Sequence, residues 1–247
     1  MLKPLIRNLV TYLVKGFSIL IILYYSFIYT DGLLNKTNKP LINNKYLRVG
    51  TEVSNLPTNR YILDRTVKIE NIYRGSQATG TYIRGGYILT VRHLYSDDNG
   101  FHNSTITTST GKKLTPLAIF LSDKSDMVIL VVVEKTLSGT ILGVPGQKEP
   151  VTLIGNPADR DFEQVNTTSL YAPYVLRDPE TNRVRMMYGF VCNGARPGFS
   201  GSGIFNNSNE MVGMMTLSDP FGYLCLGWTA DEIKRNVNEM DVPGLRL

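Results

Sequence analysis

The sequence predicts an all-β body that follows an apolar N-terminal helix. Beyond Arg60, short runs rich in Val, Ile, Tyr and Thr are separated mostly by Gly, Asn, Asp or Pro, and no helical stretches lie between them. The 22 glycines and 14 tyrosines fit strands that are joined by many turns. A doubly wound α/β fold needs helices between its strands and is therefore excluded, so the spacing predicts a β-sandwich or a β-barrel.

The runs define the predicted elements and a division of the body. One helix is expected near the end, because Thr229 and Glu232 form a capping box before Ile233 and Val237. The Gly- and Pro-containing segment 143–147 predicts a hinge between a first β unit, residues 61–142, and a second β unit with the helix, residues 143–247. The expected strands are residues 66–73, 79–84, 87–90, 127–133, 151–154, 184–192, 203–205, 211–217 and 223–228.

The N-terminal region predicts a membrane anchor over residues 1–30. Residues 9–29 are almost entirely apolar, with Lys15 as the single charge, and about 20 such residues span a bilayer. A lysine at the centre of such a helix costs roughly 2.5–3.5 kcal/mol, which the apolar run 19–23 can offset. The basic residues lie on the N-terminal side, which predicts a cytoplasmic N-terminus and an extracytoplasmic body. A cleaved signal peptide and a buried globular helix are the alternatives, and residues 31–60 are expected to form a polar linker.

The charge distribution argues against a nucleic-acid-binding function. The net charge is +5, but Lys3, Arg7 and Lys15 supply three of these charges, which leaves +2 for the rest of the chain. A nucleic-acid-binding domain needs a clustered basic face. Cys192 and Cys225 are too few for a disulfide framework, and both a single bridge and two separate thiols remain open. Their spacing matches no zinc motif, so no metal site is expected.

Three motifs along the β body carry residues suited to acyl transfer by a serine. They are residues 86–93, which end at His93, residues 123–130, which contain Asp126, and residues 198–203, which contain Ser200. Such chemistry needs a hydroxyl, a base beside it, a carboxylate that orients the base, and fixed donors for the oxyanion. His93 is the expected base, Asp126 the orienting carboxylate and Ser200 the nucleophile, with the amides of Gly198 and Ser200 as oxyanion donors. The reaction requires no cofactor.

Each candidate has a competitor in the sequence. Ser202 competes with Ser200, although neither serine lies in a Gly-x-Ser-x-Gly elbow. His102 lies in a polar stretch that predicts a surface loop, which leaves His93 as the candidate base. Other aspartates could replace Asp126, but the apolar strand that follows Asp126 directly favours it. These competing residues are Asp97, Asp98 and Asp123.

In their order along the chain, these motifs resemble those of the chymotrypsin-like serine peptidases, and most closely the HtrA (Deg) branch. The resemblance covers roughly residues 65–230 and rests on segments 80–93, 126–130, 151–157 and 198–217. It implies two six-stranded β-barrels with the active site in the cleft between them. His93 and Asp126 would come from the first barrel and Ser200 from the second. The resemblance also implies that Met215, Thr216 and Leu217 form the edge that pairs with the substrate backbone.

The chain departs from this family at several positions. Phe199 occupies the place of the usual Asp or Asn, Ser202 that of a common glycine, and Gly203 that of a common proline. No Ile-Val-Gly-Gly terminus precedes the first barrel, so activation by a freed N-terminus is not expected. Because 19 residues follow Trp228, no PDZ domain is expected.

The resemblance also places Gly194, six residues before the nucleophile, with Ala195 beside it at the floor of the pocket for the substrate side chain. Neither residue carries a charge, so we expect a neutral side chain before the cleaved bond rather than Lys or Arg. The sequence thus predicts a membrane-anchored serine endopeptidase acting on a protein or peptide. A catalytically silent scaffold that binds a partner is the alternative, and a peptidase that processes one partner only is a third possibility.

Overall fold

The computed structural model of the chain describes residues 58–72, 75–95, 104–133, 139–144, 146–170, 174–177, 184–192, 194–218 and 224–247. The predicted membrane anchor and almost all of the predicted linker lie outside these residues. No helix within the described ranges is long and apolar enough to cross a membrane.

The first half of the body forms one antiparallel sheet. Its strand order is β5-β4-β1-β2-β3-β7-β6, and the one-turn helix α3 (Arg60–Leu63) precedes it. After β3 the chain enters the 3-10 helix η2 (Arg92–Tyr95). The strands are β1 (Thr66–Asn71), β2 (Ser76–Arg84), β3 (Tyr87–Thr90), β4 (Ser104–Thr108), β5 (Lys113–Leu114), β6 (Pro116–Leu121) and β7 (Val128–Val132).

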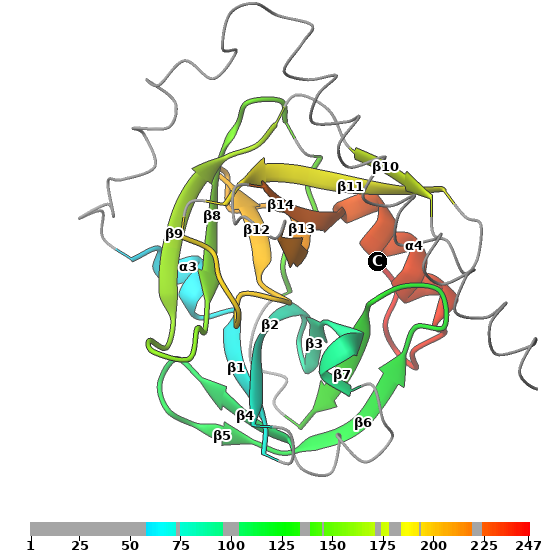
Figure 1. Ribbon diagram of the computed structural model, residues 1–247. Coiled ribbons are helices and arrows are strands. Elements are labelled where there is room, and N and C mark those ends of the chain that lie inside the picture. Colours follow the sequence, from blue (N-terminus) through cyan, green and yellow to red (C-terminus); the bar gives the residue numbers. More distant parts are fainter. Residues whose placement is uncertain are drawn as a thin grey trace, which may run out of the picture. The chain divides into compact units, whose positions relative to one another are not determined.

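The second half forms another antiparallel sheet, with the order β10-β11-β14-β13-β12-β8-β9. Figure 1 shows both sheets as curled layers, the first in cyan and green and the second from green to orange. The strands are β8 (Pro150–Gly155), β9 (Glu163–Thr168), β10 (Tyr174–Arg177), β11 (Val184–Val191), β12 (Gly203–Asn206), β13 (Met211–Ser218) and β14 (Leu224–Thr229).

The all-β class is confirmed, but the expected count of six strands in each barrel is wrong, since each sheet has seven strands within the described residues. The predicted boundary at residues 142 and 143 lies between β7 and β8. The strands that the sequence did not reveal are β4, β5, β6, β9 and β10. Most of them are short or polar, as in the sequences STITT of β4 and EQVNTT of β9, so their apolar alternation is too weak to identify them.

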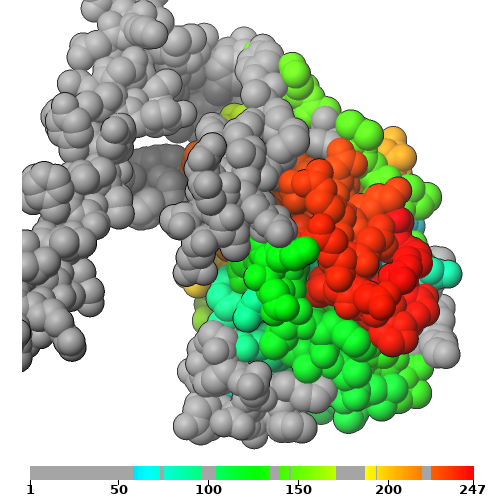
Figure 2. Space-filling view, turned by 90° about the vertical axis from the view of Figure 1, so that its right-hand side faces the viewer, coloured from blue at the N-terminus to red at the C-terminus, as the bar shows by residue number. Residues whose placement is uncertain are grey.

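The predicted C-terminal helix is confirmed as α4 (Ala230–Glu239). Thr229 caps it by accepting a hydrogen bond from the amide of Glu232 at 3.2 Å. Ile233 and Val237 of the helix, together with Val242 and Leu245 after it, are buried in the same hydrophobic cluster as β1, β2, β3 and β7. The C-terminal segment therefore closes the core of the first sheet, and Figure 2 shows it in red beside green residues of that half.

A disulfide joins Cys192 and Cys225, which decides the pairing that the sequence left open. Phe190 of β11 faces Cys225 of β14 in the register of the second sheet, so the bridge lies where β11 ends. It closes a loop with a sequence separation of 33 residues, and this loop contains the segment around Ser200. Constraining a loop of this size stabilises the fold by about 4 kcal/mol in the chain-entropy account.

Candidate active site

His93 and Asp126 lie in direct contact. The ring nitrogen Nδ1 of His93 is 2.8 Å from Oδ2 of Asp126, and the backbone amide of His93 donates to Oδ1 at 2.7 Å. His93 lies in η2, directly after β3, and Asp126 lies in the turn between β6 and β7. Because β3 pairs with β7, the end of one strand and the start of the other bring these two residues together.

Thr216 of β13 is a third partner of this pair. Its hydroxyl donates to Oδ2 of Asp126 at 2.7 Å, and Thr216 is only 3% exposed. Both oxygens of Asp126 therefore accept hydrogen bonds, which fixes the plane of the carboxylate against the imidazole ring. The sequence predicted Thr216 only as part of a substrate-binding edge. Nothing in a strand sequence reveals which buried hydroxyl will meet a carboxylate of the other sheet.

The contact with Asp126 raises the pKa of His93 above its ordinary value. The hydrogen bond from the imidazole to the carboxylate is the largest cause, and the attraction between the two charges adds to it, while burial acts in the opposite direction. The side chain of His93 remains 52% exposed, so the imidazole is accessible from solvent.

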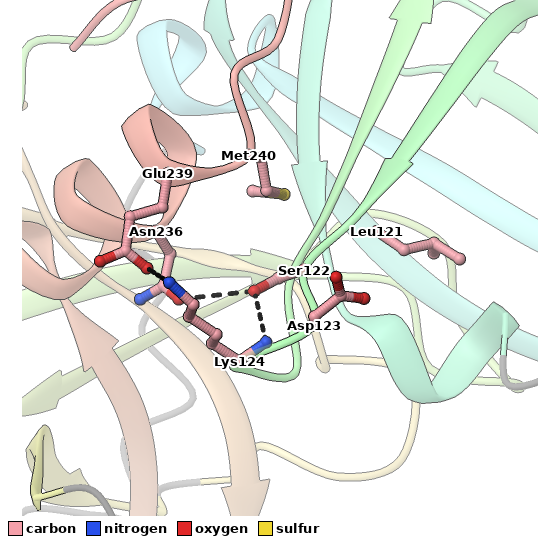
Figure 3. A pocket seen from close by; sticks show the side chains of 7 residues that line it. All are labelled: Leu121, Ser122, Asp123, Lys124, Asn236, Glu239 and Met240. Atoms are coloured by element: carbon pink, nitrogen blue, oxygen red, sulfur yellow. Dashed lines mark hydrogen bonds and ion pairs between the residues drawn. The ribbon is translucent and has the colours of Figure 1, made fainter. Parts of the chain in front are cut away.

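The turn that carries Asp126 packs against α4, as Figure 3 shows. The ammonium of Lys124 is 2.9 Å from Oε2 of Glu239, and the hydroxyl of the buried Ser122 donates to Oδ1 of the buried Asn236 at 3.4 Å. These residues line a surface pocket between the turn and α4, and the competing aspartate, Asp123, lines it too. It is exposed, and among the hydrogen bonds of the described residues none joins it to His93.

The segment around Ser200 is a tight turn that requires glycine at two positions. Gly198 has φ +104° and Gly201 has φ +88°, values that residues with a Cβ rarely adopt. A Cβ on Gly198 would lie 2.2 Å from the carbonyl oxygen of Asn156, and one on Gly201 would lie 2.0 Å from that of Thr79. The turn therefore lies directly against the backbone of its neighbours.

The backbone amides of this turn differ in whether they are hydrogen-bonded within the protein. Phe199 donates to the carbonyl of Arg196 at 3.0 Å, Gly201 to that of Met215 at 2.8 Å, and Ser202 to that of Phe199 at 2.9 Å. Within the described part of the chain, the amides of Gly198 and Ser200 donate to no protein acceptor. These two are the amides that the sequence predicted as oxyanion donors.

Phe199 anchors the turn in the core of the second half. It is fully buried, and a Cβ on Gly155 of β8 would lie 2.3 Å from its ring. The lack of a side chain on Gly155 thus creates the space that Phe199 fills. This packing explains how an apolar residue can occupy the place of the Asp or Asn that the family resemblance implied. The competing serine, Ser202, is fully buried, whereas Ser200 is only partly buried.

An ion-pair cluster holds the start of the same segment. The guanidinium of Arg196 lies 2.9 Å from Oδ1 of Asp159 and 2.7 Å from Oε2 of Glu163. These carboxylates belong to the β8–β9 hairpin, so Arg196 fastens the segment before Ser200 to this hairpin. The sequence analysis did not identify this role, because the two partners lie more than 30 residues away in the chain.

Two threonines connect the Ser200 turn to the strand that leads to His93. The amide of Thr79 in β2 donates to the carbonyl of Ser200 at 2.8 Å, and the hydroxyl of Thr90 donates to the carbonyl of Thr79 at 2.8 Å. Thr90 is the last residue of β3, three residues before His93. Among the hydrogen bonds of the described residues, none joins Ser200 to His93.

The predicted substrate-binding edge is open only in part. Both backbone groups of Met215 are hydrogen-bonded. Its amide donates to the carbonyl of Ser202 at 2.9 Å, and its carbonyl accepts from the amide of Gly201. Strand β12 pairs with β13 only up to Met214, so beyond Met215 that side of β13 is not covered by β12. Leu217 is 50% exposed there. The open edge therefore begins at Thr216.

The predicted floor of the side-chain pocket follows the disulfide directly. Gly194 is exposed and Ala195 is buried, with 8% exposure. The carbonyl of Gly194 accepts a hydrogen bond from Arg196 at 3.4 Å. The carboxylates closest to this segment in the hydrogen-bond network, those of Asp159 and Glu163, are already paired with Arg196. Among the described residues no group of His, Cys, Asp and Glu could hold a metal ion.

Comparisons with known proteins identify both a family and a fold. The family model of the trypsin-like peptidase domain matches residues 78–214. The chain is similar in structure to the Rv3671c protease of M. tuberculosis in its active form, with 17% identity, a TM-score of 0.67 and coverage of 80% of this chain and 89% of that one.

Two further structures share the fold. The inactive form of the same protease has 16% identity, a TM-score of 0.65 and coverage of 78% of this chain and 96% of that one. The serine endoprotease of Yersinia pestis has 18% identity, a TM-score of 0.57 and coverage of 75% and 67%. No curated protein sequence matches the chain. At these identities the structures establish the fold, a pair of barrel-like sheets of the chymotrypsin type.

The His93–Asp126 contact predicts a titration that NMR can follow. In a Ser200→Ala chain, His93 should titrate above pH 6.5, and Asp126→Asn should move the midpoint down because the acceptor of the imidazole proton loses its charge. Because the pKa of His93 is raised in the folded state, its contact with Asp126 stabilises the fold fully below pH 6.5. This contribution is lost as the pH rises through the folded-state pKa.

The matched control for this titration is Asp123→Asn, which removes the competing carboxylate of the same turn. It should leave the midpoint of His93 unchanged, and a downward shift equal to that of Asp126→Asn would contradict the assignment. His102, the other histidine, gives a second signal that a His102→Gln chain identifies.

Proposed function

This chain belongs to the trypsin-like peptidase family and is a serine endopeptidase, and we propose that Ser200, His93 and Asp126 form its catalytic triad. One observation carries the proposal. The Asp126–His93 pair is linked, through Thr90 and Thr79, to a turn whose Gly198 and Ser200 amides donate to no acceptor in the described part of the chain. A base with a fixed orienting carboxylate and two unoccupied donors around one serine are the parts that acyl transfer needs.

In the first half of the reaction, neutral His93 accepts the hydroxyl proton of Ser200 at Nε2 while Oγ attacks the carbonyl carbon of the peptide bond. Asp126 stabilises the imidazolium, because its carboxylate already accepts from Nδ1. The negative charge that forms on the carbonyl oxygen is bound by the free amides of Gly198 and Ser200. His93 then returns the proton to the leaving amine, the C–N bond breaks, and an acyl-enzyme remains on Ser200.

In the second half, water replaces the amine. His93 takes a proton from the water molecule as it attacks the acyl carbon, and the same two amides bind the oxyanion again. Collapse of this intermediate returns the proton to Oγ of Ser200 and releases the new carboxylic acid. Both halves need a neutral imidazole at the start, so activity rises with pH through the raised pKa of His93.

A fluorophosphonate probe tests the triad, since it labels only an activated serine. Wild type should give a single adduct by intact mass, and Ser200→Ala and His93→Ala should give none. The loss of any triad member should lower turnover by about four orders of magnitude, because the three groups act as a unit. Ser202→Ala removes the neighbouring buried hydroxyl and should still give the adduct. A folded wild type that is not labelled would contradict the proposal and favour the alternative of a catalytically silent binding scaffold.

We propose a neutral side chain, aliphatic or aromatic, before the cleaved bond. The proposal rests on Gly194 and Ala195 at the expected pocket floor and on the pairing of Asp159 and Glu163 with Arg196, which leaves these carboxylates engaged. A mixture-based peptide library should be cleaved mainly after neutral residues. Cleavage mainly after Lys or Arg would show that a carboxylate reaches the pocket and would overturn this specificity.

We also propose that the apolar segment 9–29 holds the peptidase to a membrane, with the body on the extracytoplasmic side. This proposal rests on the sequence alone. After carbonate washing of membranes from cells that express the full chain, the protein should stay in the pellet at its full mass. Release into the supernatant would contradict an anchor, and a shorter mass would indicate a cleaved signal peptide.

A further inference from the structure

Thr79 of β2 is fully buried, and both its hydroxyl and its backbone amide donate hydrogen bonds to the Ser200 turn. Its hydroxyl donates to the carbonyl of Gly198 at 2.7 Å, and its amide donates to the carbonyl of Ser200 at 2.8 Å. One residue of the first sheet thus fixes the two carbonyls on either side of Phe199. The carbonyl of Thr79 accepts from Thr90 at 2.8 Å, which holds Thr79 in place from behind.

Asn156, which directly follows β8 of the second sheet, completes the network. Its amide and its side-chain Nδ2 donate to the hydroxyl of Thr79 at 3.0 Å and 3.2 Å, and Nδ2 also donates to the carbonyl of Val67 at 3.2 Å. The hydroxyl of Thr79 therefore donates one hydrogen bond, to the carbonyl of Gly198, and accepts two, both from Asn156. Without it, the carbonyl of Gly198 keeps only the amide of Asn156 at 3.4 Å, a long bond.

The position of Gly198 makes this anchor necessary. A glycine at φ +104° has no Cβ to limit its rotation, so its peptide units turn more easily than those of other residues. Among the described residues the amide of Gly198 has no protein acceptor, so no hydrogen bond of its own fixes its direction. Its direction depends on bonds that fix the neighbouring carbonyls, and the shortest of these is the one from the hydroxyl of Thr79.

We propose that Thr79 is a positioning residue whose hydroxyl holds the turn from Gly198 to Ser200 ready to bind an oxyanion before any substrate arrives. This inference rests on the proposed function of Gly198 and Ser200 as donors. The order of the oxyanion donors would then depend on a hydrogen bond that is built into the folded chain. Thr79 itself touches no reacting atom.

The test compares Thr79→Val, which keeps the shape and removes the hydroxyl, with Thr79→Ser, which keeps the hydroxyl. Removing one oxyanion donor lowers kcat by about 10²–10³-fold, so a loosened donor in Thr79→Val should lower kcat and the rate of fluorophosphonate labelling by about 10–100-fold. KM should stay within about twofold, because the substrate ground state makes little use of the oxyanion donors. Thr79→Ser should recover most of the rate.

Thr66→Val is the matched control for loss of a buried threonine hydroxyl. Thr66 lies in β1, is 2% exposed and donates to the carbonyl of Ile62 at 2.9 Å, far along the chain from the turn. It should destabilise the fold to a similar degree and leave the labelling rate of the folded protein unchanged. An equal loss of rate in Thr66→Val and Thr79→Val would assign the effect to stability and overturn the proposal.

Hydrogen exchange of the backbone amides separates this inference from the proposed function. Thr79→Val should speed exchange at Phe199 and Ser202, whose amides are bonded within the turn, whereas Thr79→Ser should not. If wild type is not labelled, the triad proposal fails while the exchange result still tests the anchor. If Thr79→Val is labelled and exchanges like wild type, Thr79 does not position the turn.

Discussion

Buried polar groups at the junction of the two sheets must be hydrogen-bonded, and most other features of the site depend on how this is done. Leaving such a group without a partner costs about 1–3 kcal/mol. The turn around Ser200 brings the carbonyls of Gly198 and Ser200 into this junction, and Thr79 satisfies both. Asn156 satisfies the hydroxyl of Thr79 in return. The geometry of the turn is therefore a consequence of pairing polar groups between two β sheets.

Strand β13 holds the other side of the site, also through hydrogen bonds. The carbonyl of Met215 accepts from Gly201 in the turn, and the next residue, Thr216, donates to Asp126. Two adjacent residues of one strand therefore hold the segment with the serine and the carboxylate that contacts His93. A shift of this strand would disturb both at once, which couples the packing of the second sheet to the imidazole of the first.

Apolar packing and an ion-pair cluster hold the turn from the remaining sides. Phe199 fills the space beside Gly155, and Arg196 joins the carboxylates of the β8–β9 hairpin. Helix α4 has a comparable role for the turn with Asp126, through Asn236 and Glu239. Exposed ion pairs contribute little, about 0–1 kcal/mol each, so the buried contacts of Phe199 and Asn236 carry more of the fixation.

The sequence alone determined the all-β class, the capped C-terminal helix and the three motifs, because these depend on local patterns: apolar alternation, a capping box and residues adjacent in the chain. Only the tertiary structure decided the seven-stranded sheets, the Cys192–Cys225 bridge, and the partners of Thr79 and Thr216. A threonine in a strand reads as an ordinary β-former, and whether its hydroxyl meets a carbonyl or a carboxylate depends on residues more than 80 positions away. Such pairings exist only once both sheets have folded against each other.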